Sequence, residues 1–384
     1  MKRLAIITTH PIQYYAPIFK LLHQRGQIAI KVFYTWGEAS LHNYDPGFQQ
    51  TIQWDMPLLE GYSFEWVQNT SANPGSHHYK GIITPYLNKQ VENWNPDAVL
   101  VFGWAYKGHL SAMRYFSGKV PVFFRGDSTL LDKLAGIKSA VKKVFLKRVY
   151  SNVDCAFYVG INNRAYYKAY GLDDRQLIFA PHAVDNEKFS ARRDQEILDL
   201  RNRFNLVDED ILILFAGKFE PKKNPLLLME AFKKMTKAGV HLLFVGNGEL
   251  ENELKNKASG IVNIHFMDFQ NQSVMPVIYQ AADLFCLPSA GPGETWGLSV
   301  NEAMAAGKAV LVSNLVGCAA DLVRDGINGK IFKSGSVNEL TNALQALTTT
   351  REALQKMGLQ SAEIIKPWNF NAIAKAIEDR LTGQ

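Results

Sequence analysis

Gly291-Pro-Gly-Glu-Thr-Trp-Gly-Leu-Ser-Val-Asn-Glu302 is the stretch of sequence that decides the fold. The apolar run before it, Ala281 to Leu287, is short enough to be a buried strand. The residues after it are compatible with a helix closed by Gly307, and Ala309 to Val312 is the next buried strand. This strand–loop–helix–strand order predicts a parallel α/β sheet, with the loop at the carboxyl end of a strand, where such sheets bind ligands.

The spacing within this stretch predicts an anion site between two carboxylates. If the helix begins near Gly297, the backbone amides of Gly297, Leu298 and Ser299 lack helical partners and suit a diphosphate. Glu294 stands before the helix and Glu302 lies along it, so hydroxyl-rich groups are expected at both ends of the anion. That pattern describes a nucleotide-diphosphate sugar. The alternative is a plain loop–helix crossover with two solvated glutamates.

The same residues carry a resemblance to a known family. Glu294, seven residues and then Glu302, followed by Ala-Met-Ala-Ala-Gly, resembles the E-x7-E signature of retaining glycosyltransferases of family 4, which have the GT-B fold. Gly317 and the segment Asp325-Gly326-Ile-Asn-Gly329 continue the match. Asp321 departs from it, because the family usually carries Glu there. The resemblance implies that Glu294 holds sugar hydroxyls and that Glu302 holds the ribose.

A second loop follows the predicted strand Ile211 to Ala216. Gly217-Lys-Phe-Glu-Pro-Lys-Lys223 resembles the family's G-R-x4-K loop, with Lys218 in place of Arg. A glycine turn with two cations at a strand end is suited to clamp a diphosphate. Lysine supplies charge without the bidentate fork of arginine, and Lys223 is expected to be exposed in the loop. Gly246 ends the next predicted strand, near the donor in the family.

The first half of the chain has fewer matches to the family. His10, Gln13 and Asp127 all follow predicted strands of a parallel sheet and are expected at one edge of it. Related enzymes often place a histidine near the transferred sugar, and Asp127 is the nearest polar substitute. Asp127 is alternatively the N-cap of the next helix, and His10 is alternatively a turn residue before Pro11.

These assignments give the following candidate site. Catalytic roles are expected for Glu294, Lys223, Lys218 and Asp127, and substrate binding for Glu302, Gly297, Leu298, Gly217, Thr295, Trp296, His10, Gln13, His182 and Gly246. No metal or cofactor is expected, because two lysines and a helix terminus supply the positive field. Asp208-Glu-Asp210 imitates a metal-binding DxD motif, but it stands at the start of a strand, the wrong end for ligands in a parallel sheet.

The length of 384 residues suits two domains. The predicted fold class is α/β, with two Rossmann-like, doubly wound domains facing across a cleft. The expected boundaries are 1–185 for an acceptor-side domain, 186–210 for a connector and 211–367 for the nucleotide-sugar domain. A helix at about 368–384 is expected to return to the first domain. The irregular, aromatic-rich stretch 36–61 is typical of a functional or lid-like loop.

Composition and charge limit the partners. Hydrophobic content of 47% and charged content of 20% are typical of a globular protein. The net charge of +6 suits phosphorylated ligands or an anionic membrane surface, and nucleic acid is not expected because no recognition motif accompanies the charge. No apolar run reaches the length of a membrane span. The predicted location is the cytoplasm, with the inner face of the membrane as a refinement.

The segment Lys133–Tyr150 is basic and amphipathic. Its apolar stripe consists of Leu134, Ile137, Val141, Val144, Phe145 and Val149. The simplest interpretation is that the stripe faces the core, while the basic face alternatively docks on anionic lipid headgroups.

The function predicted from these features is transfer of a sugar, with retention, from a nucleotide-diphosphate sugar to a glycan or glycolipid. Cell-surface polysaccharide or lipopolysaccharide biosynthesis is the expected setting. The same fold also hosts sugar-nucleotide epimerases and phosphorylases, and a non-catalytic donor-binding subunit is a third alternative.

Overall fold

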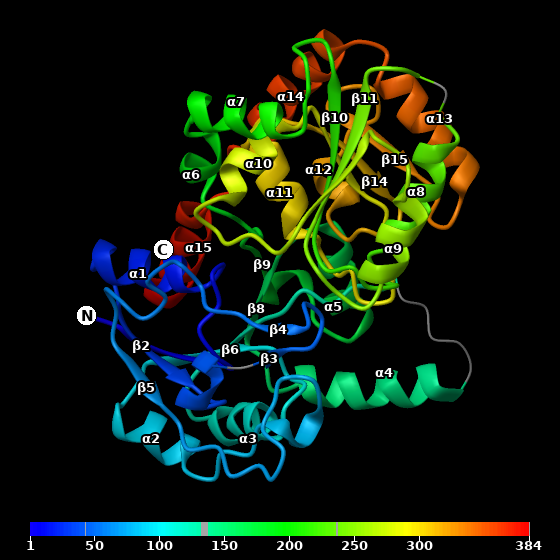
Figure 1. The fold of residues 1–384 in the computed structure, drawn as a ribbon. Helices are drawn as coiled ribbons and strands as arrows, with labels where there is room; N and C mark the ends of the chain where they lie inside the picture. Colours follow the sequence, from blue (N-terminus) through cyan, green and yellow to red (C-terminus); the bar gives the residue numbers. More distant parts are fainter. Residues whose placement is uncertain (43, 132–136, 236, 384) are drawn as a thin grey trace. The chain divides into compact units, whose positions relative to one another are not determined.

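The computed structural model describes residues 1–42, 44–131, 137–235 and 237–383 (Figure 1). The chain forms two compact units. The first consists of Met1–Asn43, Met56–His182 and Phe370–Gln384, and the second of Tyr44–Asp55 and Ala183–Asn369. Each unit is therefore assembled from segments that are far apart in the sequence.

The first unit is built on a seven-stranded sheet in which every neighbouring pair is parallel. In sheet order the strands are β5 (Phe64–Trp66), β2 (Ala29–Tyr34), β1 (Arg3–Thr8), β6 (Ala98–Phe102), β7 (Val122–Arg125), β8 (Cys155–Tyr158) and β9 (Leu177–Phe179). The apolar, β-branched runs at these positions form strands because both faces of such a sheet are buried. Since all strands run the same way, their carboxyl ends meet at one edge.

Helices accompany this sheet. They are α1 (Ala16–Arg25), α2 (Leu87–Asn93), α3 (Lys107–Phe116), α4 (Ile137–Tyr150), α5 (Ile161–Ala169) and α15 (Phe370–Thr382), with 3-10 turns η1 (Glu38–His42), η2 (Tyr79–Gly81) and η3 (Asp174–Gln176). Helix α1 ends at Gly26, which is a left-handed C-cap. The last helix, α15, lies beside α1 (Figure 1). Arg25 joins the two helices through Glu378 at 2.8 Å.

The second unit contains a six-stranded parallel sheet and a short antiparallel hairpin. In sheet order the strands are β12 (Ile264–Met267), β11 (Val240–Val245), β10 (Ile211–Ala216), β13 (Leu284–Leu287), β14 (Ala309–Ser313) and β15 (Gly329–Phe332), and the hairpin pairs β3 (Tyr44–Asp45) with β4 (Gln50–Thr51). The helices are α6 (Asn186–Ser190), α7 (Asp194–Arg203), α8 (Pro225–Lys233), α9 (Glu251–Ala258), α10 (Met275–Ala281), α11 (Leu298–Ala305), α12 (Ala319–Leu322), α13 (Val337–Leu347) and α14 (Arg351–Ile365).

The strand predicted over Ala281 to Leu287 begins later than expected. Ala281 ends helix α10, and the strand starts at Leu284. Asp283 marks the boundary, because its buried carboxylate accepts a hydrogen bond from the backbone amide of Leu212 at 2.9 Å and pairs with Arg351 at 2.7 Å. A charged side chain with fixed partners therefore separates the helix from the strand inside one apolar run.

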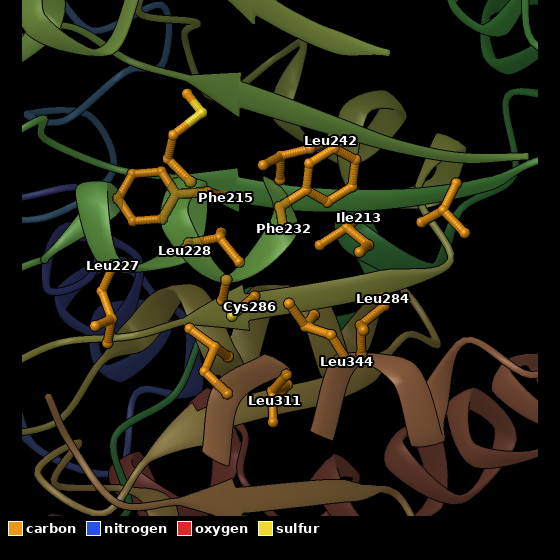
Figure 2. Close-up of a cluster of buried hydrophobic side chains, with 14 of the residues drawn as sticks. Ile213, Phe215, Leu227, Leu228, Phe232, Leu242, Leu284, Cys286, Leu311 and Leu344 are labelled. Atoms are coloured by element: carbon orange, nitrogen blue, oxygen red, sulfur yellow. The ribbon is translucent and has the colours of Figure 1, made fainter. Parts of the chain in front are cut away.

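The core of the second unit lies between strands and helices of that unit. Figure 2 shows side chains of β10, β11, β13 and β14 meeting those of α8 and α13. Its labelled members are Ile213, Phe215, Leu227, Leu228, Phe232, Leu242, Leu284, Cys286, Leu311 and Leu344. Each fully buried side chain of this size stabilises the fold by about 1.5–3 kcal/mol. Cys286 is fully buried.

Helix α4 corrects the expectation that its whole apolar stripe faces the core. Val141 and Val144 are 63% and 72% exposed, and Phe145 is also exposed. Leu146 and Val149 are buried instead, so only the second half of the helix contributes to the core. Of the predicted segment, Lys133 and Leu134 lie outside the described residues, as do the side chains at 137 and 138. Among the described helices, none is long and apolar enough to cross a membrane.

Candidate active site

Three loops follow neighbouring strands of the second unit's sheet. The loop from Gly217 to Lys223 follows β10, Gly246 follows β11, and the loop from Ser289 to Gly297 follows β13. Strand β10 lies between β11 and β13. Because the sheet is parallel, all three loops emerge at the same edge. The sequence-predicted donor residues therefore share one edge of one sheet.

The shortest contact between two of these loops joins Lys223 to Glu294. The lysine Nζ lies 2.6 Å from Oε2 of the glutamate. Ser289 donates its hydroxyl to the same oxygen at 2.8 Å. The side chains of Lys223 and Glu294 are only 17% and 7% exposed, so the expectation of an exposed Lys223 is wrong. The lysine is enclosed because it neutralises a carboxylate that is itself buried.

Helix α11 begins where the sequence predicts. Gly297 is its N-cap with φ of 98°, and the first helical residue is Leu298. A side chain at 297 would be strained at this φ, and its Cβ would lie 2.9 Å from Val316 Cγ1. The first amides of a helix have no intrahelical partner. The helix thus presents its positive end in the loop that carries Glu294.

Glu302 lies one turn into α11 and is buried. Its Oε2 accepts a hydrogen bond from the Tyr279 hydroxyl at 2.8 Å, and its Oε1 lies 3.5 Å from Nε2 of Gln272. The sequence analysis missed both partners. Tyr279 belongs to α10 and Gln272 to the loop before it, so only the folded sheet brings them to Glu302. The alternative of two solvated glutamates is wrong for both Glu294 and Glu302.

Thr295 and Trp296 lie between Glu294 and the helix. The indole of Trp296 is buried, donates to Asn301 Oδ1 at 2.8 Å and packs against Trp368 at 5.3 Å between ring centroids. Gly317 meets this loop so closely that a Cβ there would lie 1.7 Å from the Thr295 carbonyl oxygen. The Trp296 side chain therefore supports the loop from inside the unit.

Lys218, the other lysine of the loop after β10, forms a separate ion pair. Its Nζ lies 2.8 and 3.0 Å from the two carboxylate oxygens of Asp45. Asp45 is on β3, in the hairpin of the second unit. The sequence analysis gave no role to Asp45, because nothing in its neighbourhood indicates a contact with a residue 173 positions away.

In the first unit, His10 follows β1 and Gln13 lies in the turn before α1. The ring of His10 packs edge-on against Trp36 at 5.1 Å, and its Nδ1 lies 2.8 Å from the hydroxyl of Thr9. Burial lowers the pKa of His10 to about 4. The imidazole is therefore neutral at pH 7 and is available for hydrogen bonding rather than for a charge contact.

Asp127 and His182 meet at the same edge of the first unit's sheet. Asp127 Oδ2 lies 3.8 Å from His182 Nε2. Burial lowers the pKa of His182, and Asp127 opposes this shift. The buried guanidinium of Arg125 donates to the carbonyls of Ala180 and Pro181, at 2.8 Å each, and so fixes the segment that carries His182. The chain from Asp127 to Leu131 is not helical, so the alternative that Asp127 caps the next helix is wrong.

Within the described part of the chain, no group of three or more His, Cys, Asp or Glu side chains is arranged to hold a metal ion. Asp208-Glu-Asp210 directly precedes β10. Its position at the amino end of the strand, opposite the candidate loops, is confirmed.

Comparison with known sequences gives a match over the part of the chain that carries the candidate donor loops. Residues 196–363 match the family described as glycosyl transferases group 1. The chain is 31% identical over 169 residues to a phosphatidyl-myo-inositol mannosyltransferase of Mycobacterium leprae, covering 43% of this chain and 44% of that protein. It is 27% identical over 196 residues to a lipopolysaccharide 1,2-N-acetylglucosaminetransferase of Salmonella typhimurium, covering 48% and 51%. The chain thus spans about half the length of the curated relatives it matches.

Solved structures resemble the whole chain. Anabaena Alr3699/HepE in complex with UDP and glucose has a TM-score of 0.73 at 16% identity and covers 100% of both chains. WaaG, a glycosyltransferase involved in lipopolysaccharide biosynthesis, has a TM-score of 0.70 at 15% identity, covering 99% of this chain and 100% of that one. At these identities the likeness shows the fold. Residues 196–363 thus match the group 1 glycosyl transferases, and the two parallel-sheet units of the chain have the GT-B fold.

Proposed function

We propose that this protein is a retaining glycosyltransferase that moves a sugar from a nucleotide-diphosphate sugar to a hydroxyl group of a glycan or glycolipid. The observation that carries the proposal is the enclosed Lys223–Glu294 pair, at 2.6 Å, which joins the loop after β10 to the loop that ends at the amino terminus of α11. A cation, a carboxylate and helix amides at one sheet edge are what a sugar diphosphate requires for recognition.

The donor site uses the second unit. Lys218, Lys223 and the first amides of α11 supply the positive field for the diphosphate. Glu302, oriented by the Tyr279 hydroxyl at 2.8 Å, accepts from the ribose hydroxyls. Glu294 uses Oε2 for both Lys223 and Ser289, so a sugar hydroxyl approaches Oε1. The solved HepE structure with UDP and glucose supports this class of donor.

The chemistry follows from the leaving group. The bond between the anomeric carbon and the diphosphate breaks, and a bond from the same carbon to the acceptor oxygen forms on the same face of the sugar. The acceptor's proton departs with the nucleoside diphosphate. Negative charge grows on the diphosphate as the bond breaks, so an ammonium group such as that of Lys223 stabilises the transition state more than the ground state. No metal ion is needed in this scheme.

The acceptor site uses the first unit. His10, Gln13, Asp127 and His182 follow parallel strands of its sheet, and the aromatic ring of Trp36 packs against His10. Aromatic faces and neutral hydrogen-bonding groups suit a sugar acceptor. The mannosyl and N-acetylglucosaminyl transferases among the relatives have names that refer to phosphatidylinositol and lipopolysaccharide, which supports a glycan or glycolipid acceptor in cell-surface biosynthesis.

Helix α4 is the proposed membrane contact. Its exposed apolar side chains, Val141, Val144 and Phe145, alternate with Lys143 and Lys147, which are also exposed. Apolar side chains flanked by lysines fit the boundary between acyl chains and anionic headgroups. We place the protein in the cytoplasm at the inner face of the membrane, where a glycolipid acceptor would be reached.

The proposal is tested by assaying transfer from UDP-, GDP- and ADP-sugars to lipid and oligosaccharide acceptors. Glu302→Gln is expected to weaken binding of the free nucleoside diphosphate, whereas Glu294→Gln is expected to leave that affinity unchanged and to lower transfer. Turnover without an acceptor would instead indicate an epimerase. Activity is expected to survive EDTA, and its loss with recovery on adding manganese would contradict the metal-free scheme.

A further inference from the structure

The hairpin of the second unit is held in a defined shape by one carboxylate. Strands β3 and β4 pair antiparallel, with Asp45 opposite Gln50. Asp45 Oδ1 accepts hydrogen bonds from the backbone amides of Gly47 at 2.8 Å and Phe48 at 3.2 Å. These bonds close the turn between the strands, and they fix the direction in which the carboxylate points.

The Asp45 carboxylate forms an ion pair with Lys218. Both oxygens of Asp45 lie within 3.0 Å of Lys218 Nζ, and the lysine also lies 5.0 Å from the centre of the Phe48 ring. A Cβ at Gly47 would lie 2.5 Å from Lys218 Cδ, so a side chain there would push the lysine away from its present position. Burial acts to raise the pKa of Asp45, but the hydrogen bond and charge of Lys218, together with the backbone amides of Phe48 and Gly47, outweigh it and the net pKa is lowered.

Aromatic and polar contacts anchor the rest of the hairpin segment on the second unit. Phe48 and Trp54 pack against Phe269 at 4.8 and 6.1 Å between ring centroids. Asn271 donates to the carbonyl of Gln53 at 2.6 Å, and the Asp55 carboxylate accepts from the amide of Ser273 at 3.0 Å. The hairpin segment therefore packs on the loop after β12, and its Asp45 carboxylate contacts Lys218 in the loop after β10.

We propose that the segment Tyr44–Asp55 is an anion gate, in which Asp45 occupies Lys218 until the diphosphate of the donor displaces it. The inference rests on the proposed function, because it takes Lys218 as a ligand of the donor diphosphate. Two anions cannot both hold one ammonium group at hydrogen-bond distance without repelling each other. Asp45 therefore competes with every anion that approaches Lys218.

The gate has a purpose that the clamp alone lacks. Without Asp45, Lys218 would attract phosphate groups of any kind. With Asp45 in place, a ligand must make further contacts that compensate for breaking the Asp45–Lys218 ion pair, such as contacts of a ribose with Glu302. Asp45 thus sets specificity by lowering the affinity for anions in general.

The test is the affinity of the full-length protein for UDP, GDP and ADP by titration calorimetry. Asp45→Asn removes the charge but keeps Oδ1 as acceptor for the amides of Gly47 and Phe48. We expect it to tighten binding of the accepted nucleoside diphosphate by about twofold to fivefold, the range for losing a partly exposed competing ion pair. Glu60→Gln, which removes an exposed carboxylate elsewhere, is the charge-matched control and is expected to bind like the wild type.

A second pair of variants identifies the lysine. In a Lys218→Met background, Asp45→Asn is expected to change nothing. Unchanged or weaker binding by the Asp45→Asn single variant, with a wild-type melting temperature, would overturn the gate. If UDP, GDP or ADP binds the wild type and Lys223→Met weakens it, the proposed function survives that result. If none of the three binds the wild type or Asp45→Asn, both the donor site and the gate are wrong.

Discussion

Lys223 and Glu294 depend on each other for charge compensation, since the glutamate is buried and the lysine Nζ lies 2.6 Å away. We expect Lys223→Met to lower the free energy of unfolding by about 3 kcal/mol, because it leaves a buried carboxylate without its cation. Adding Glu294→Gln to the Lys223→Met variant is expected to restore most of that stability without restoring transfer. Chemical denaturation and a transfer assay on both variants measure the two effects.

The double variant separates the structural role of the lysine from its catalytic role. A double variant as unstable as Lys223→Met alone would show that the lysine stabilises the loop by packing rather than by charge. Recovery of transfer together with stability would contradict the assignment of Lys223 to the diphosphate.

His109 gives a prediction about pH. It is fully buried, its Nδ1 faces the carbonyls of Phe102 and Gly103, and its Nε2 lies 2.8 Å from the Thr35 hydroxyl. Burial lowers the pKa of His109 to about 4. As the pH falls, His109 takes up a proton in the unfolded chain before it does so in the folded protein. The stabilisation that comes from burying the neutral ring is therefore complete above about pH 6.5 and is lost as the pH falls towards 4.

The expected change between those limits is about 3 kcal/mol for a single histidine. His10 and His265 have similarly lowered pKa values, and burial also lowers the pKa values of His182 and His241, so the wild type is expected to show the sum of these contributions. Denaturant melts at pH 7.5 and 4.5 should give a smaller difference for His109→Gln than for the wild type. Equal differences would mean that His109 is not the group that titrates.

The residues that sequence reasoning found share one property, which is a fixed distance along the chain from a strand end. Glu294, Glu302 and Lys223 could be recognised in this way, because the loop and the first turn of the next helix are local structure. Tyr279 and Asp45 could not. Their contacts join separate elements that meet only in the fold, and a single sequence carries no signal of that meeting.

At the scale of elements, apolar runs predicted the central strands well because both faces of a parallel sheet are buried. Helix α4 shows where such reasoning fails. Its periodicity identifies an apolar face, but not what covers that face. Leu146 and Val149 meet the core, whereas Val141 and Val144 remain exposed.

The exposed half of α4 therefore predicts binding to lipid. Val141→Ser combined with Val144→Ser is expected to lower partition onto vesicles containing phosphatidylserine by about tenfold, from the loss of buried methyl groups. The melting temperature should not change, since both side chains are exposed. Leu198→Ser, at an exposed position on α7, is the matched control in a vesicle co-sedimentation assay. Equal binding by all three proteins would exclude this helix as the membrane contact.

At the scale of the whole molecule, the first unit is completed by a helix that follows the second unit in the chain. Ile373, Ala374 and Ile377 of α15 are buried, and Glu378 pairs with Arg25. We expect truncation after Asn369 to destabilise the first unit by about 3–6 kcal/mol, counting two buried isoleucines. That loss is comparable with the stability of a whole domain.

Differential scanning calorimetry measures this effect. The truncated chain should show a separate early transition for the first unit and a retained transition for the second. Removal of residues 383–384 alone is the control and should leave the wild-type profile. A single unchanged transition after truncation at Asn369 would show that α15 contributes little to the first unit.

The pairing of Arg25 with Glu378 across 353 positions also sets an order for folding during synthesis. At about 5–20 residues per second, α1 would wait between roughly 20 and 70 s on the ribosome for α15. The second unit has all its segments, the early hairpin included, once Asn369 is made. The unit whose synthesis begins first is thus the last to be complete, and during that interval the surface of α1 that α15 covers is open to chaperones or to other chains.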